Sequence, residues 1–336
     1  MIKNFINILI VSWISFSLIN CEENKSQSKK SKQFTVILDT DANNELDDQH
    51  AIAYLLFNQK IFKVKGITVN KTYSGKELKH HVAEAQRIVT LCGFKNKIKV
   101  IPGASGRYED IVKTIHKEDF DGNQAVNFII KNASEIKNEK LIVLSIGKLT
   151  NIALALKKAP EIANKIKVIW LGSNWPKPGE YNLENDPSSI NKILKNPRVE
   201  LEIVTVRYGE NNGTDAVSVS VEEMKRKMKG MGPKIAKPII GRHGGEFDRF
   251  GDYSIELFVK YRHPTRPLFD LCVLSILKNP DLGHMKIAYK VSFDGKNWGY
   301  NGDENRQVVF WEKFNKEGIL KDFFETMRAS ENLINN

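Results

Sequence analysis

The sequence predicts an α/β fold: an open, mainly parallel twisted sheet with helices on both faces. From residue 34 onward, short apolar runs rich in β-branched residues alternate with longer runs whose apolar residues recur at helical spacing. This alternation is typical of βαβ units, in which a helix carries the chain back to begin the next parallel strand. With 336 residues, 41% of them hydrophobic, the chain is long enough to bury a large core around such a sheet.

The first two thirds of the chain contain the clearest elements. The run 34–38 is rich in β-branched residues, which favours a buried strand, and 48–58 follows it with helical spacing. Gly93 and Pro160 are helix-ending signals, so helices over 75–91 and 149–158 are expected to stop before them. The same patterns predict strands at 64–69, 98–101, 141–146, 166–171 and 201–206, and a helix at 123–136.

The part of the chain after residue 215 is less regular. Here the sequence predicts a hairpin around Asp294-Gly295, because Asp-Gly is a frequent turn pair. Helices are expected near 220–230, 245–261, 267–278 and 314–328.

The composition limits the classes of partner. The net charge is +11, but the lysines are spread along the chain and no basic run is interleaved with aromatic residues. A nucleic-acid groove requires both features together, so nucleic acid is not an expected partner. Three cysteines are too few for a disulfide scaffold.

The N-terminus has the pattern of an export signal. Lys3 precedes a mostly apolar run to Ile19, which predicts a signal peptide over 1–20. Leu18-Ile19-Asn20-Cys21 resembles a bacterial lipobox, so 21–32 is expected to be a lipid-anchored flexible tether, with one domain over 33–332. The protein would then be exported and lipid-anchored in the bacterial cell envelope, in the periplasm or at the outer membrane. An uncleaved N-terminal anchor is the alternative.

Four aspartates fall within ten residues at the end of the first predicted strand: Asp39, Asp41, Asp47 and Asp48. Ligands bind beyond the carboxyl ends of parallel strands, so this is the edge where a site is expected. Like charges this close ionise together only if a cation lies among them, and oxygen ligands favour Ca²⁺ or Mg²⁺. The alternative is an acidic helix N-terminus without an ion.

Several segments together resemble the inosine–uridine preferring nucleoside hydrolase family. Asp39-Thr-Asp41, followed by Asp47-Asp48 and an apolar helix, is similar to the family signature Asp-x-Asp-Pro-Gly-x-Asp-Asp-Ala, although Ala42 to Leu46 replaces the three residues Pro-Gly-x. Further segments match in the same order: Gly66 to Asn70, Gly147 to Ala153, Gly179 to Asn182 with Asp186-Pro187, and Pro267 to Asp270. The resemblance covers about residues 34 to 278 and implies the family's fold, with a Rossmann-like core, in a lipoprotein-type member.

The resemblance also implies a reaction, which is the Ca²⁺-dependent hydrolysis of the N-glycosidic bond of ribonucleosides to ribose and free base, as in purine or pyrimidine salvage. The implied metal ligands are Asp41, Asp48, the backbone carbonyl of Thr150, and Asp270. A water on the metal would be the nucleophile and Asp41 the base that takes its proton. The implied substrate-binding residues are Asp47, Asn70, Asn174, Glu180, Asn182 and Phe269.

The group that activates the leaving base stays open. Phe269 occupies a position where many family members have a histidine, and an aromatic ring there would stack on the base. His243 and His116 are candidate acids without a motif, and Arg207 and Tyr208 either meet the leaving group or pair with surface acids. The expected partner is a ribonucleoside or another ribosyl compound, and the chain is expected to form a homodimer or homotetramer.

Two other functions compete with this one. The first is a non-catalytic lipoprotein that binds a nucleoside or sugar, which the altered loop at Ala42 to Leu46 and Phe269 would favour. The second is a haloacid dehalogenase-type phosphatase, which also begins with Asp-x-Asp after a first strand. That class requires Thr or Val where this chain has Asn43, and it lacks the adjacent Asp-Asp pair.

Overall fold

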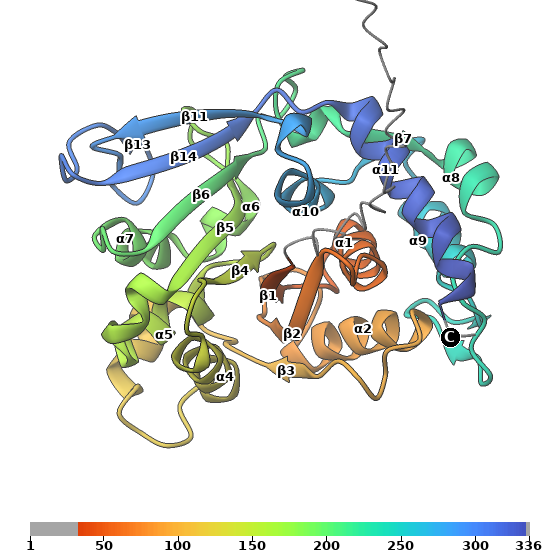
Figure 1. Ribbon diagram of the computed structural model, residues 1–336, viewed down its shortest axis with the longest axis horizontal. Coiled ribbons are helices and arrows are strands. Elements are labelled where there is room, and N and C mark those ends of the chain that lie inside the picture. Colours follow the sequence, from red (N-terminus) through yellow and green to blue (C-terminus); the bar gives the residue numbers. More distant parts are fainter. Residues whose placement is uncertain (1–32, 334–336) are drawn as a thin grey trace, which may run out of the picture. The chain divides into compact units, whose positions relative to one another are not determined.

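An eight-stranded sheet forms the centre of the computed structural model, which describes residues 33–333 (Figure 1). Neighbouring strands run parallel except at one edge, where β11 is antiparallel to β14. The order across the sheet is β11(His284–Tyr289), β14(Gln307–Glu312), β6(Glu200–Thr205), β5(Ile166–Ser173), β4(Leu141–Ser145), β1(Phe34–Thr40), β2(Phe62–Val69) and β3(Val100–Pro102).

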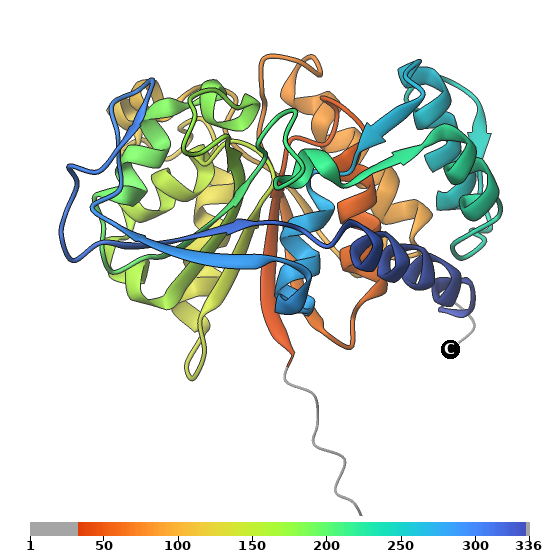
Figure 2. The same ribbon diagram turned by 90° about the horizontal axis from the view of Figure 1, so that it is seen from above.

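Helices cover both faces of the sheet, and each face has its own hydrophobic core. Figures 1 and 2 show the two groups of helices on opposite sides of the strands. One face is covered by α1(Asp47–Phe57), α2(Leu78–Leu91), α8(Val221–Met228), α9(Phe250–Tyr261), α10(Leu271–Lys278) and α11(Lys316–Ala329). The other is covered by α4(Asn123–Glu135), α5(Thr150–Lys158) and α7(Pro187–Leu194). The predicted fold class is confirmed.

The strand register brings the ends of the central strands together. Asp39, near the end of β1, lies opposite Thr68 of β2 on one side and Ser145 of β4 on the other. Because all three strands are parallel, the segments that follow them leave the sheet at the same edge. The acidic segment after β1 therefore lies beside the segments that carry Asn70 and Thr150.

The structure differs from the predicted elements mainly after residue 170. The long loop after β5 contains α6(Tyr181–Asn185) and α7. The helix expected from 245 begins at Phe250, because Gly244 and Gly245 have positive φ angles and the next residues form β9(Glu246–Phe247) with β8(Ile239–Ile240). The helix expected from 267 begins at Leu271, because Pro267 belongs to β10(Thr265–Pro267), which pairs with β7(Ser218–Ser220).

The last part of the chain adds the edge of the sheet. Strands β11 and β14 were not predicted, whereas the hairpin at Asp294-Gly295 is confirmed by the pairing of β12(Ser292–Phe293) with β13(Trp298–Gly299). The remaining α-helix of the described residues is α3(Tyr108–Ile111). Within residues 33–333, no helix is long and apolar enough to cross a membrane. The predicted signal peptide (1–20) and tether (21–32) lie outside the described residues.

Candidate active site

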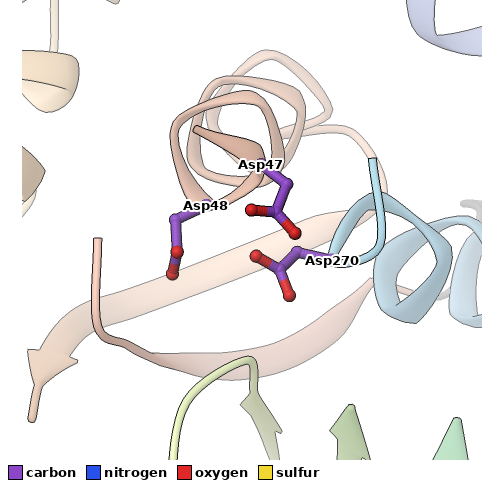
Figure 3. Close-up of side chains that lie close together, drawn as sticks. All are labelled: Asp47, Asp48 and Asp270. Carbon is purple, nitrogen blue, oxygen red and sulfur yellow. The ribbon is translucent and has the colours of Figure 1, made fainter. Parts of the chain in front are cut away.

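Three buried carboxylates meet at the edge of the sheet where the central strands end. Asp47 and Asp48 are the first two residues of α1, and Asp270 directly precedes α10. Each offers an oxygen within 4.8 Å of the others, and Figure 3 shows the three side chains converging from the two helices. The positive ends of two helix dipoles thus face one carboxylate cluster, which we call the Asp triad.

The Asp triad is electrostatically unfavourable when all three groups are ionised. Burial, and then repulsion from Asp48, raises the pKa of Asp47 to about 8. Burial likewise raises the pKa of Asp48 to about 7, and burial with repulsion from its acidic neighbours holds the pKa of Asp270 well above its usual value. A divalent cation would remove this repulsion, and a donor set made only of oxygens fits the hard ions Ca²⁺ and Mg²⁺.

Asp41 lies beside the triad with one oxygen free. Its Oδ2 accepts hydrogen bonds from Thr72 Oγ1 at 2.5 Å and Asn44 Nδ2 at 2.7 Å. Its Oδ1 is buried and has no hydrogen-bond partner among the described residues. Burial and the charge of Asp48 raise the pKa of Asp41 well above its usual value. An unpaired buried oxygen is costly, so this atom suits a cation or a water, and the residues present fit the implied metal.

A hydrogen-bond network around Asp39 fixes two amide side chains, those of Asn70 and Asn151. Asp39 accepts from Thr68 Oγ1 at 2.5 Å, Asn151 Nδ2 at 2.8 Å and Asn70 Nδ2 at 2.9 Å. Burial raises the pKa of Asp39 to about 6, although these hydrogen bonds oppose the rise. A Cβ on Gly147 would lie 2.8 Å from Asn70 Nδ2, so only glycine allows this close approach.

Thr150 is the first residue of α5, at the end of β4. Its Oγ1 donates to Asp186 Oδ2 at 2.5 Å, and the same oxygen accepts from the Tyr108 backbone N–H at 2.8 Å. Asp186 therefore holds the start of α5 in place. The side chain of Thr150 is directed to this contact, and the role of its carbonyl as a metal ligand stays a prediction.

A pocket of about 190 Å³ opens beside the Asp triad. Four of the predicted substrate-binding residues line it: Asp47, Glu180, Asn182 and Phe269. Asn70 is directed instead to Asp39, with its Oδ1 buried and unpartnered among the described residues. Asn174 donates to the Pro178 carbonyl and accepts from the Tyr208 N–H, so in this structure it holds its own loop to the segment that follows β6. The ribose contacts of Asn70 and Asn174 stay predictions.

The polar wall of the pocket comes from the start of α6. Glu180 caps this helix by accepting hydrogen bonds from the backbone N–H groups of Asn182 and Leu183. Burial raises the pKa of Glu180 to about 8. Asn182 donates to the carbonyls of Ile146 and Leu171, which leaves its buried Oδ1 without a partner among the described residues. That oxygen is available to accept a hydrogen bond from a ligand hydroxyl.

Aromatic and charged side chains form the other wall. The ring of Tyr208 meets the ring of Phe269 edge-on, with centroids 6.1 Å apart. Arg207, in contrast, forms an ion pair with Glu312 and does not line the pocket. His243 and His116 are exposed and lie outside the pocket lining.

Sequence reasoning missed two charged residues of this wall, Glu45 and Arg266. The one available signal was the unusual loop at Ala42 to Leu46, which contains Glu45. Nothing in the sequence around Arg266 indicates that it pairs with that loop.

Comparisons with known proteins show the family and agree with the fold. The profile of the family described as inosine-uridine preferring nucleoside hydrolase matches residues 36–320. A probable uridine nucleosidase 2 of Oryza sativa subsp. japonica is 29% identical over 184 residues, which are 47% of this chain and 52% of that protein. The chain thus spans about half the length of this curated relative.

Solved structures of nucleoside hydrolases share the fold. A plant nucleoside hydrolase has a TM-score of 0.68 at 18% identity, and the match covers 89% of this chain and 100% of that one. An inosine-uridine preferring nucleoside hydrolase from Bacillus anthracis has a TM-score of 0.66 at 17% identity, covering 88% and 99% of the two chains. Because the family profile matches residues 36–320, which are most of the chain, the chain belongs to the inosine-uridine preferring nucleoside hydrolase family.

Proposed function

We propose that this protein hydrolyses the N-glycosidic bond of ribonucleosides in a Ca²⁺-dependent reaction that releases ribose and the free base. The Asp triad carries the proposal, because its three buried carboxylates lie at the wall of a pocket that also holds Glu180 and Asn182. Family membership supports the same chemistry. The ion would be held by Asp41, Asp48, Asp270 and the carbonyl of Thr150, and its positive charge makes a nearby water more acidic.

The protein's own residues account for the remaining steps. Asp41 has a free buried Oδ1, which takes the proton of the attacking water. Breaking the bond between C1′ and the base nitrogen places positive charge on the ribosyl group. Asp47, Glu180 and Asn182 line the pocket, and their side-chain oxygens stabilise that charge as it develops.

The same residues select the sugar. A site built to bind the 2′-hydroxyl and 3′-hydroxyl leaves polar groups unpaired when one hydroxyl is missing. We therefore expect ribonucleosides to be cleaved much faster than 2′-deoxyribonucleosides.

One assay tests the proposal and separates it from its alternatives. Purified protein is incubated with uridine, cytidine, inosine, guanosine and adenosine in 1 mM CaCl₂ (about the concentration that fills an extracellular-type site), and free ribose is measured. Ribose release that stops in excess EDTA supports the proposal. Binding of a nucleoside without ribose release would favour the passive binding protein. Release of phosphate from phosphomonoesters with Mg²⁺ would support the phosphatase.

We also propose that the protein is exported and anchored through a lipid on Cys21, the only membrane attachment we expect, and that it forms a homodimer or homotetramer. The lipobox-like segment before Cys21 supports the anchor. Mass spectrometry of the mature N-terminus tests it, and an acylated Cys21 is expected. Replacing Cys21 with Ser should release the protein from membranes, and membrane retention of that variant would contradict the proposal. Light scattering at micromolar protein measures the oligomeric state.

A further inference from the structure

A partly buried cation, Arg266, lies in the wall of the pocket near Asp270. Its side chain is only 12% exposed and forms an ion pair with Glu45, which belongs to the loop that departs from the family pattern. Burial lowers the pKa of Arg266 to about 10, so the guanidinium still carries its charge at neutral pH. The pocket therefore combines an acidic side, the Asp triad, with a positive charge at Arg266.

The guanidinium is held in one position by several contacts. It lies over the ring of Phe269, 5.2 Å from the centroid, and over the ring of Tyr261, 4.6 Å from the centroid. One terminal nitrogen donates to the Tyr261 hydroxyl at 2.8 Å. Its Nε is buried and has no hydrogen-bond partner among the described residues. A fixed charge with an unsatisfied donor at a pocket wall is suited to bind an anionic or carbonyl-bearing ligand group.

The departing base needs a positively charged group with a hydrogen-bond donor. When the bond from C1′ to the base nitrogen breaks, the electron pair stays with the base, which becomes an anion unless it gains a proton. Phe269 has no proton to give, and no histidine is among the described residues that line the pocket. Tyr208 and Glu180 also line the pocket and carry a proton at neutral pH, so a fixed positive charge is a second way to lower the barrier besides proton transfer.

We propose that Arg266 stabilises the departing nucleobase as an anion, with Glu45 as the residue that positions it. This inference rests on the proposed function. The electron pair of the broken bond goes to the base, and the oxygen of water bonds to C1′ while its proton passes to Asp41. The base anion takes a proton from solvent after release, so no general acid is required.

A comparison of two leaving groups tests the inference. The 4-nitrophenolate group leaves without help, because it is a much weaker base than the uracil anion that leaves from uridine. Arg266→Ala should therefore lower kcat/KM for uridine by about 100-fold, the usual loss on removing one charge-stabilising donor. With 4-nitrophenyl β-D-ribofuranoside in the same Ca²⁺ buffer, the loss should stay within about fivefold.

Further variants separate catalysis from folding. Arg266→Lys keeps the charge and should recover part of the uridine activity, and guanidinium ion added to Arg266→Ala should restore some of it. Glu45→Gln should reduce uridine cleavage more than nitrophenyl riboside cleavage, in the same direction as Arg266→Ala but less. Arg198→Ala, an exposed arginine that donates to the Pro160 carbonyl, is the matched control and should leave both rates unchanged.

Failure of this inference and failure of the proposed function give different results. Suppose that wild-type protein cleaves both substrates, and that Arg266→Ala unfolds at the wild-type temperature but loses kcat/KM for both substrates by the same factor. Arg266 then does not act on the leaving group, and the inference is wrong. Absence of guanidinium rescue together with equal losses would contradict the inference in the same way. If wild-type protein releases ribose from neither substrate in Ca²⁺, the proposed function itself fails and this inference fails with it.

Discussion

Replacing Asp270 with Asn should have opposite effects on stability with and without calcium. In EDTA the variant should unfold at a higher temperature than wild type, because one member of the Asp triad no longer carries a charge. In calcium it should unfold at a lower temperature, because it has lost a metal ligand. The change in sign is the diagnostic result, since a mutation that only damages packing lowers stability in both conditions.

The size of the effect follows from the geometry of the triad. Two unit charges at 4.8 Å, the upper limit of the oxygen separations in the triad, repel by about 3 kcal/mol at an effective dielectric constant of 20. Asp270→Asn removes two of the three pairwise repulsions, although protonation of the wild-type triad already relieves part of them. The free energy of unfolding in EDTA at pH 8 should therefore increase by about 3 kcal/mol. A domain of about 300 residues shifts its Tm by roughly 1.6 °C per kcal/mol, which predicts an increase of about 5 °C.

The same triad makes the metal-free protein sensitive to pH. Because these pKa values are raised, the folded state binds more protons than the unfolded state between about pH 4 and about pH 8. The free energy of unfolding in EDTA should therefore fall as the pH rises through this range. With calcium at 1,000 times its Kd, wild type should gain about 4 kcal/mol, and Asp270→Asn should gain much less.

Thermal unfolding followed by circular dichroism, in 5 mM EDTA and in 1 mM CaCl₂ (about 1,000 times a micromolar Kd), measures all of these effects. Asp119→Asn is the control, because Asp119 is exposed and its replacement should change Tm by less than about 1 °C in either buffer. A lower Tm for Asp270→Asn in both buffers would refute the electrostatic explanation of the triad.

Three further predictions concern the site and the core. Asp41→Asn should lower kcat by several orders of magnitude in the ribose assay, because a base and a metal charge are lost together, and near-normal turnover would show that another group is the base. Phe269→Ala should mainly raise KM for nucleosides, because the ring supplies stacking rather than a proton, and an unchanged KM would contradict that contact. Burial lowers the pKa of His50 to about 4, so the folded state loses about 3 kcal/mol as the pH falls from 6.5 to 4. In urea titrations with calcium, His50→Gln should show less of this acid sensitivity than wild type, and an equal acid sensitivity would mean that His50 does not contribute.

Strands β1 and β4 could be predicted because they are buried almost throughout and are rich in apolar, β-branched residues. Strand β11 could not, because Met285, Ile287 and Tyr289 are exposed at the sheet edge and the run lacks a burial pattern. Helix α7 was missed because it spans only Pro187–Leu194 within a long loop. Short or exposed elements form through tertiary contacts that no local pattern records.

The site likewise contains residues that a local motif predicts and residues that only the tertiary fold brings together. Asp47 and Asp48 follow a buried strand in a local motif, so their place at a helix start and at the sheet edge could be inferred from sequence. The ion pair of Glu45 with Arg266 joins two segments far apart in the chain, and it depends on how β10 and the loop after β1 meet. Such a pair becomes visible only when the fold has brought both segments to one pocket.

Calorimetric titration of calcium into metal-stripped protein asks whether the Asp triad is a metal site. The titration is run at pH 7 in two buffers of different ionisation enthalpy, so that proton release can be counted. We expect one ion bound per chain, with release of about one proton or more, because the pKa of Asp47 is about 8 before the ion binds. Absence of binding, or binding without proton release, would contradict the metal site proposed at Asp41, Asp48, Asp270 and Thr150, which includes two members of the Asp triad.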